Sequence, residues 1–282
     1  MKTKLDFHRI TLSQEKVLTA LAQFKFLTTG QLLSLGAMSE RTNLNKNISE
    51  LRKFSSPLVG SISFGVHPGK GKLESVHYLT SHGAALLREV YGEDYPIRFP
   101  KGNHGLFQQD YFHRVNTVTF HIALWQWVQR NDAEILFFCT YFDKLSTGKE
   151  KGYRAESAIR ISERQYLIAD ALFMLQTPGS PQLYALEMYN GNDTQRVHHS
   201  LTAHLTALNN GQPSLQFGMD YASRVLCVFE FEVYKVQLMK RLCEDEGFTG
   251  AKEFFLFKSL EELKTEEFFE WQLFDGTKTG LF

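Results

Sequence analysis

Two acidic residues stand inside hydrophobic runs of the sequence. Asp170 lies in LIADALFML, residues 167–175, and Glu187 lies in QLYALEMYN, residues 182–190. Both runs predict strands that are buried in a sheet. Because a buried carboxylate without a partner is costly or shifts its pKa, two of them on adjacent strands require something positive between them. We expect Mg²⁺ or Mn²⁺ there, since Mg²⁺ takes one or two carboxylates and keeps its other places for water and phosphate. The alternative is a satisfied polar pair in a core without activity.

Three further residues are candidates for a part in the same chemistry. Alternation puts Tyr189 on the strand face of Glu187, where it is either a hydrogen-bond donor, a nucleophile or an aromatic residue packed on the following helix. Glu156 is either a third acid or a solvated loop residue. His113 lies on the polar side of a long helix and could offer its ring to phosphate or water.

The histidines that follow the second run are weaker candidates. His198, His199 and His204 belong to the helix expected in TQRVHHSLTAHLTAL, and their spacing suits shared metal ligation poorly. Because lone helical histidines are usually surface residues, we expect these three to face solvent.

The elements that position the acids follow from the hydrophobic pattern. A long amphipathic helix is expected over residues 109–130, followed by strands in EILFFCTYF, LIADALFML and QLYALEMYN. A helix follows, and then a fourth strand in RVLCVFEFEVY, residues 224–234. The Glu-rich end, from CEDEGF to EELKTEEFFEW, is most simply a solvated helix face, and the alternative is that its Phe and Trp residues cover the sheet edge or a partner. Long buried strands flanked by helices predict an α/β layer with a mixed central sheet.

The amino-terminal part has a different pattern, with three short helices and a hairpin. Ser13 is a candidate cap of the first helix, Thr28 or Thr29 caps the second, and Leu44 and Ile48 begin the buried stripe of the third. PLVGSISFG and SVHYLTSHG then predict two strands joined by a Gly- and Lys-containing tip. This order predicts a winged helix-turn-helix.

The polar face of the third helix and the hairpin tip carry candidate DNA contacts. Residues 41–72 hold six basic groups against one acid, which favours DNA contact over a merely solvated face. The candidates are Arg41, Asn43, Asn45, Lys46, Asn47, Arg52, Lys53, Lys70 and Lys72.

Charge separates the two parts although the net charge is zero. Residues 1–100 hold 13 Lys and Arg against 8 Asp and Glu, and the remainder holds 18 against 23. The stretch YGEDYPIRFPKGNHG interrupts both helix and strand patterns, so we expect a winged-helix domain over 1–100 and a catalytic domain over 101–282. The sequence shows neither a membrane segment nor a secretory signal, and we expect a cytoplasmic protein.

Several motifs together carry a resemblance to a known family. The chain from about residue 10 to 230 combines the predicted winged helix with YFHRVNTVTFHIAL, IADALFML and LYALEMYNGNDTQ. It resembles the replication-relaxation family and its MobC-type plasmid mobilisation relaxases, which have a PD-(D/E)XK nuclease-like domain. Two positions depart from the family pattern: Ala169 stands where a proline precedes the Asp, and Tyr189 stands where an acid or a Lys is usual.

The resemblance implies a metal-dependent relaxase that nicks one strand of double-stranded DNA at a plasmid origin of transfer. It also implies an accessory mobilisation or coupling protein as a possible partner. Asp170 and Glu187 would hold the ion, with Tyr189 as helper or nucleophile. A non-catalytic DNA-binding regulator of plasmid replication or transcription is the alternative, and the missing Lys favours it. A restriction-type endonuclease that cuts both strands is a third hypothesis.

Overall fold

The chain forms two compact units in the computed structural model, which describes residues 10–100, 110–143, 155–162, 165–220, 222–265 and 267–282. One unit is Met1–Ile122 and the other is Ala123–Phe282. The boundary between the units falls inside helix α5, Tyr111–Val128, whereas the sequence predicted the domain boundary near residue 100. Part of the expected linker, residues 101–109, lies outside the described residues.

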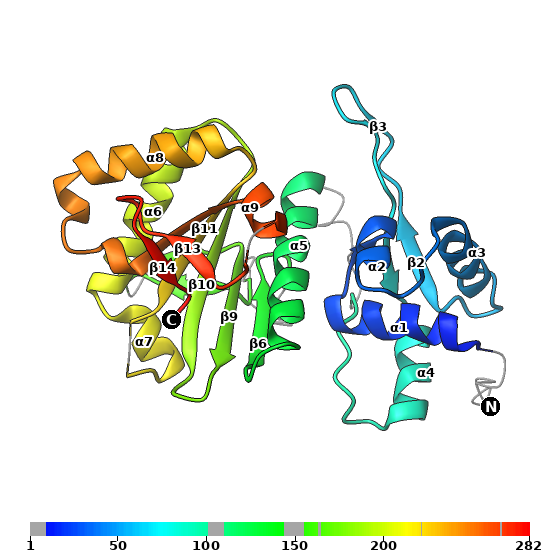
Figure 1. The fold of residues 1–282 in the computed structure, drawn as a ribbon. Helices are drawn as coiled ribbons and strands as arrows, with labels where there is room; N and C mark the ends of the chain where they lie inside the picture. The colour runs from blue at the N-terminus through cyan, green and yellow to red at the C-terminus, as the bar shows by residue number, and fades with distance from the viewer. Residues whose placement is uncertain (1–9, 101–109, 144–154, 163–164, 221, 266) are drawn as a thin grey trace. The chain divides into compact units, whose positions relative to one another are not determined.

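Four helices of the first unit surround a small sheet (Figure 1). Thr11, not Ser13, caps the first helix. Its hydroxyl accepts a hydrogen bond from the Gln14 N–H, and the Gln14 side-chain oxygen accepts one from the Thr11 N–H. Thr28 caps the second helix in the same way, as one of the two predicted caps. The helices are α1 Leu12–Phe24, α2 Thr29–Ser34, α3 Arg41–Arg52 and α4 Ser81–Tyr91.

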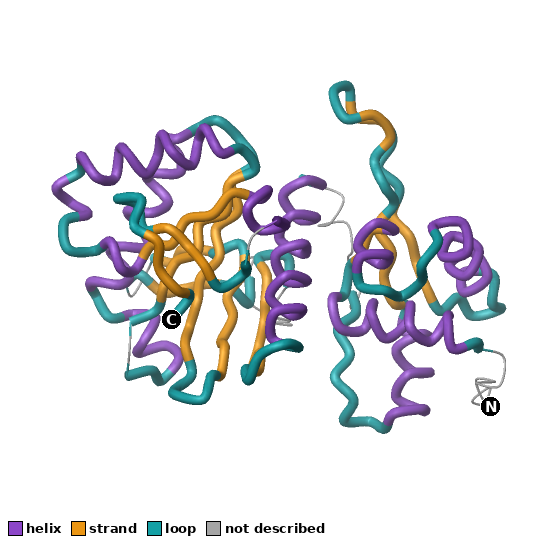
Figure 2. Tube along the Cα trace, in the orientation of Figure 1, coloured by secondary structure: helices purple, strands orange, loops and turns teal. Residues whose placement is uncertain are grey.

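The small sheet of the first unit ends in a long hairpin. Its strand order is β1-β5-β2 and all its pairs are antiparallel. Beyond β2 and β5 the chain continues into a second pair, β3 and β4, which Figure 2 shows extending away from the sheet. The predicted hairpin is therefore present. The strands are β1 Leu27–Thr28, β2 Val59–Ile62, β3 Val66–His67, β4 Gly71–Lys72 and β5 Val76–Leu79.

A seven-stranded mixed sheet forms the centre of the second unit, in the order β14-β13-β12-β11-β10-β9-β6. Strands β6, β9 and β10 are antiparallel neighbours, while β11 lies parallel to β10 and β12 parallel to β11. The predicted mixed central sheet is confirmed. The strands are β6 Glu134–Thr140, β9 Ala171–Gln176, β10 Gln182–Tyr189, β11 Arg224–Phe229, β12 Phe255–Ser259, β13 Glu270–Gln272 and β14 Lys278–Gly280.

Helices α6 and α8 pack on one face of this sheet. Leu201 of α6 and Leu238 of α8 join Val225 and Phe229 of β11 in a single buried cluster. Asp193 starts α6 by accepting a hydrogen bond from the Arg196 N–H. The remaining elements are α6 Thr194–Asn209, α7 Gln212–Phe217, α8 Glu232–Glu244, α9 Leu260–Thr265, the 3₁₀ turns η3 Glu246–Phe248 and η4 Lys252–Phe254, and the two-stranded hairpin β7 Ala158–Arg160 with β8 Tyr166–Ile168.

Three predicted elements differ from the structure. The run LIADALFML is divided between β8 and β9, with Ala169 and Asp170 between them. The fourth strand ends at Phe229, and its predicted last residues belong to α8, because Glu232 favours the positive end of a helix. The Glu-rich end adds β12 and β13 to the sheet, since its aromatic residues are buried there.

Among the helices that the structure describes, none combines the length and the apolar character that a membrane span requires.

Candidate functional site

Asp170 lies directly beside Glu187. Strands β9 and β10 pair with Ala171 opposite Leu186. If this register is continued by one residue, Asp170 lies opposite Glu187. The Asp170 N–H donates to the Leu186 carbonyl at 3.0 Å, and the Asp170 Oδ2 accepts from the Met188 N–H at 2.6 Å. These bonds flank Glu187 on both sides. The sequence prediction that the two acids are neighbours is consistent with this register.

Glu187 faces helix α6. Side chains alternate along β10, and Leu183, Ala185 and Tyr189 all belong to clusters that include residues of α6. Glu187 is an even number of residues from each of these three, so its side chain points to the same face of the sheet. It therefore lies on the covered face of the sheet, opposite Cys227 of β11 in the register.

A buried histidine of α6 contacts Glu187. The Nε2 atom of His204 lies 2.6 Å from Glu187 Oε1, and the two residues are only 3% and 6% exposed. An imidazole that donates through Nε2 satisfies this carboxylate oxygen, and a protonated imidazole also neutralises its charge. The partner of Glu187 that the sequence led us to expect as a metal ion is thus, for its Oε1 atom, a side chain of the protein.

The expectation that His204 faces solvent is wrong. His204 lies on the buried stripe of α6 with Val197, Leu201 and Leu205, which recur at helical spacing. That spacing was visible in the sequence and could have identified His204 as a core residue. His199 is exposed as predicted, while His198 is partly buried against Asp245, with Nε2 2.6 Å from Oδ2.

Tyr189 is poorly placed to act as a nucleophile. Burial raises the pKa of its phenol well above the ordinary value, and the nearby charges of Glu187 and Asp170 raise it further. The hydroxyl oxygen is buried and makes no good hydrogen bond within the described part of the chain. Its ring packs on Phe229, with centroids 4.9 Å apart. The packed aromatic residue, one of the three alternatives, describes these contacts best.

Asp170 and Glu187 could hold a metal ion only if water supplied most of its other ligands. In the residues that the structure describes, no group of three or more His, Cys, Asp or Glu is arranged to hold a metal. Asp170 and Glu187 supply hard carboxylate oxygens from adjacent positions, which fits Mg²⁺ or Mn²⁺ that keeps several water ligands. Such an ion has to coexist with the contact between Glu187 and His204.

Glu156 and His113 have contacts of their own among the described residues. Glu156 is exposed, and its N–H donates to the carbonyl of Asp143 at 2.9 Å. Asp143 is itself buried and accepts from both the N–H and the hydroxyl of Thr140. His113 belongs to the first unit, where its Nδ1 lies 3.5 Å from the Asp110 carboxylate.

The predicted DNA contacts are on the surface of the first unit. The buried stripe of α3 is Leu44, Ile48 and Leu51, and its other faces are polar. Eight of the nine candidates are exposed, and Asn47 is partly buried, where its amide donates to Asn43 O. The exposed candidates are Arg41, Asn43, Asn45, Lys46, Arg52, Lys53, Lys70 and Lys72.

Two of these basic side chains are held by neighbours. Arg41 forms an ion pair with Glu74, which also accepts from the Gly30 N–H at the start of α2. Burial raises the pKa of Glu74, but these hydrogen bonds outweigh it and leave the pKa below its usual value. The Lys70 ammonium lies 4.2 Å from the ring centre of Phe112, so the tip of the hairpin is steadied by a cation–π contact.

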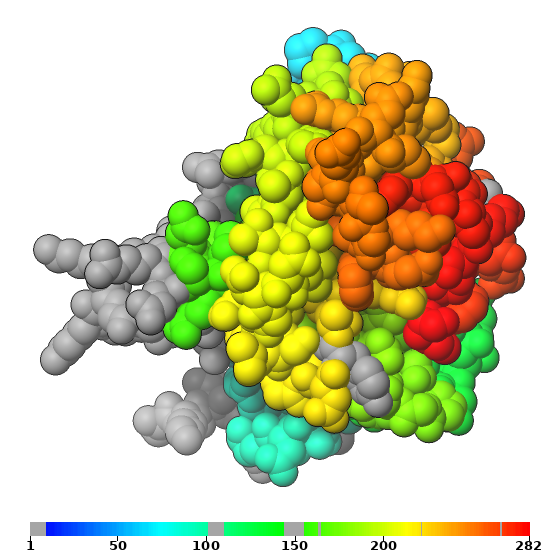
Figure 3. Space-filling model, turned by 90° about the vertical axis from the view of Figure 1, so that its left-hand side faces the viewer, coloured from blue at the N-terminus to red at the C-terminus, as the bar shows by residue number. Residues whose placement is uncertain are grey.

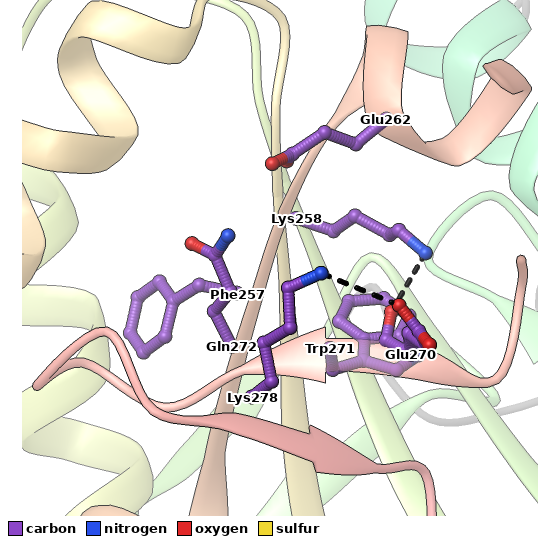
Figure 4. Close-up of a pocket in the computed structure, with 7 residues that line it drawn as sticks. All are labelled: Phe257, Lys258, Glu262, Glu270, Trp271, Gln272 and Lys278. Atoms are coloured by element: carbon purple, nitrogen blue, oxygen red, sulfur yellow. Dashed lines mark hydrogen bonds and ion pairs between the residues drawn. The ribbon is translucent and has the colours of Figure 1, made fainter. Parts of the chain in front are cut away.

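A second polar cluster in the second unit is structural. Figure 4 shows Lys258, Glu270 and Trp271 around a cavity of about 10 Å³, which is room for no more than one water molecule. The buried Lys258 ammonium donates to the carbonyls of Glu267 and Glu270, both at 2.7 Å. These bonds connect β12 to the turn before β13 and to the first residue of β13.

Comparisons of the chain with protein-family models, with curated proteins and with solved structures find no significant match.

Proposed function

We propose that this protein binds double-stranded DNA through α3 and the β3–β4 hairpin of its first unit, as a winged helix-turn-helix. One observation carries the proposal: exposed basic and amide side chains cover α3 on the faces opposite its buried stripe, and the adjoining hairpin adds two lysines. In this mode α3 lies in the major groove, where Asn and Arg contact base edges, and the hairpin lysines contact phosphates.

The order of elements in the first unit supports this mode. A short strand follows α1, the pair α2 and α3 comes next, and β2 and β5 lead into and out of the hairpin. Residues Thr28 and Gln31 cap α2 reciprocally, which fixes the helix that precedes α3. A rigid base for α3 suits groove recognition, because a recognition helix has to keep its angle to the sheet.

Fluorescence anisotropy with labelled duplexes tests DNA binding. Lys46→Ala, and Lys70→Ala with Lys72→Ala, should weaken binding and reduce its dependence on salt. Lys240→Ala is the matched control, since this lysine is exposed on α8 of the second unit. Equal affinity of the α3 and hairpin variants and the wild type would remove the proposal.

A second candidate function is metal-dependent nicking of one DNA strand, in a relaxase of plasmid mobilisation. The juxtaposition of Asp170 and Glu187 favours it. So does the order α5, β6, β9, β10, α6 and β11 around the central sheet, with the β7–β8 hairpin and α7 inserted, which resembles that of PD-(D/E)XK nucleases. In this function the two carboxylates hold Mg²⁺ or Mn²⁺, which would polarise the scissile phosphate and activate water. The contact between His204 and Glu187 favours the rival function of a non-catalytic regulator.

Nicking is tested on a supercoiled plasmid that carries the cognate transfer origin. Asp170→Asn preserves the size of the side chain and should abolish nicking without loss of duplex binding. Denaturing gel electrophoresis of the same reactions would reveal a covalent protein–DNA adduct. A regulator would bind the plasmid but neither nick it nor take up Mn²⁺ in a manner that depends on Asp170.

A further inference from the structure

A hollow of about 540 Å³ lies in the second unit between the β7–β8 hairpin and α7. Its volume falls in the range of roughly 300 to 1,000 Å³ that is typical of ligand sites. In Figure 3 the green hairpin and the yellow α7 are neighbours on the face turned to the viewer. The lining side chains are Arg160, Tyr166, Gln212, Leu215 and Gln216.

The two walls of this hollow are fixed to each other. The Gln216 side chain of α7 accepts from the Arg160 N–H at 3.0 Å and donates to the Ala158 carbonyl at 2.9 Å. Phe217, the next residue, stacks on Phe137 of β6, with ring centroids 5.7 Å apart. The hollow is thus formed by anchored elements rather than by a loose surface loop.

Its exposed side chains combine an aromatic face with a positive charge. Tyr166 is 52% exposed and Leu215 is 75% exposed, although both are large and carry apolar surface. The Arg160 guanidinium lies 5.8 Å from the Tyr166 ring centre, and its Nη2 donates to the Tyr166 hydroxyl at 3.4 Å. None of the five lining residues is acidic, so an anionic ligand with a flat ring suits the hollow better than a cationic one.

The hollow is connected along the chain to the candidate acids. Strand β8 ends at Ile168, and Asp170 follows after one residue. The Ser157 hydroxyl donates to the Ala169 carbonyl at 2.5 Å, which holds the start of the hairpin against the same segment. The hairpin that lines the hollow is therefore held to the segment that leads into Asp170.

We infer that this hollow binds single-stranded DNA, with one base stacked on Tyr166 and an adjacent phosphate on Arg160. This inference rests on the proposed function: a protein that binds duplex DNA through its first unit would bind single-stranded DNA through its second. Single strands fit better than duplexes, since a base inside a duplex is stacked on its neighbours and has no free face for Tyr166. Stacking on an aromatic ring beside a basic side chain binds such strands with little sequence preference.

The test uses a fluorescein-labelled oligothymidylate and the full chain. Tyr166→Ala removes the stacking ring and Arg160→Ala removes the phosphate contact. Each should weaken binding about ten-fold, which corresponds to about 1.4 kcal/mol. Tyr166→Phe is the matched control: it keeps the ring and should keep most of the affinity. Duplex binding should be unchanged in all three variants, whereas Lys46→Ala should weaken duplex binding and leave the oligothymidylate bound.

Photocrosslinking adds a readout that needs no variant. A 5-iodouracil oligonucleotide crosslinked to the wild-type protein should modify the peptide that contains Tyr166, as identified by mass spectrometry. Three results would overturn the inference. Oligothymidylate binding could be unchanged in Tyr166→Ala and Arg160→Ala, the crosslinks could all lie outside the peptide that contains Tyr166, or the protein could bind oligouridylate but not oligothymidylate. Failure of the proposed function would appear separately, as duplex binding that does not depend on α3.

Discussion

The basic residues of α3 and the acids Asp170 and Glu187 lie in different environments. Lys46 and Arg52 are exposed on the surface of the first unit. Glu187 is buried against His204, and Asp170 accepts a backbone hydrogen bond. The difference teaches that substitution of an exposed α3 residue such as Lys46 reports on binding, whereas substitution of Glu187 reports on stability before it reports on any activity.

The largest effect is expected at His204. His204→Leu leaves the Glu187 carboxylate buried without its histidine, so the free energy of unfolding should fall by about 3 to 5 kcal/mol. His199→Ala, on the exposed side of the same helix, should change it by less than about 0.5 kcal/mol. Urea denaturation measures both values.

A double variant sharpens this result. Replacing both partners, Glu187→Leu with His204→Leu, should recover most of the lost stability, because an apolar pair has no charge to desolvate. If His204→Leu is as stable as the wild type, the contact contributes nothing and the contrast with α3 disappears.

His77, a buried histidine of the first unit, is expected to make the stability of that unit depend on pH. His77 bonds to the hydroxyls of Thr29 and Ser61, and burial, followed by the charge of Arg52, lowers its pKa from 6.5 to about 4. As the pH falls below 6.5, the unfolded chain binds a proton at His77 that the folded chain refuses until about pH 4. Stability should therefore fall across this window, by on the order of 3 kcal/mol from this group.

The measurement is chemical denaturation of the wild type and His77→Gln across that pH window. The variant should lose less stability than the wild type on acidification. His82→Gln serves as control, because His82 is exposed on α4. Identical pH profiles for wild type and His77→Gln would contradict the assignment.

A smaller effect is expected on the exposed side of the comparison. Lys46→Ala should leave the unfolding free energy within about 0.5 kcal/mol of the wild type. It should lower the slope of log affinity against log salt by about 1, as expected for loss of one phosphate contact. Anisotropy titrations at several salt concentrations give the slope, and an unchanged slope would place Lys46 outside the interface.

The smallest effect on function is expected at Tyr189. Tyr189→Phe removes a buried hydroxyl that has no good hydrogen bond among the described residues, so stability should stay within about 1 kcal/mol and could rise. Any nicking activity should survive, because the pKa of this phenol is raised well above its usual value. Loss of nicking with intact folding would restore Tyr189 as a catalytic residue.

The sequence by itself determined the elements whose periodicity is strong. Leu44 and Ile48 predicted the buried side of α3, and the apolar runs predicted β6, β9 and β10 in order, because local spacing decides which face of an element is buried. It placed Asp170 within a strand next to the strand of Glu187, whereas Asp170 directly precedes β9 and is set beside Glu187 by the register of β9 and β10.

Only the tertiary structure decided what those acids contact. Position 187 meets His204 because α6 packs across β10, and the partner of a buried charge depends on residues that are distant in sequence. The end of the fourth strand and the three carboxy-terminal strands were likewise decided by packing, since a short aromatic segment becomes a strand where an open sheet edge can bind it.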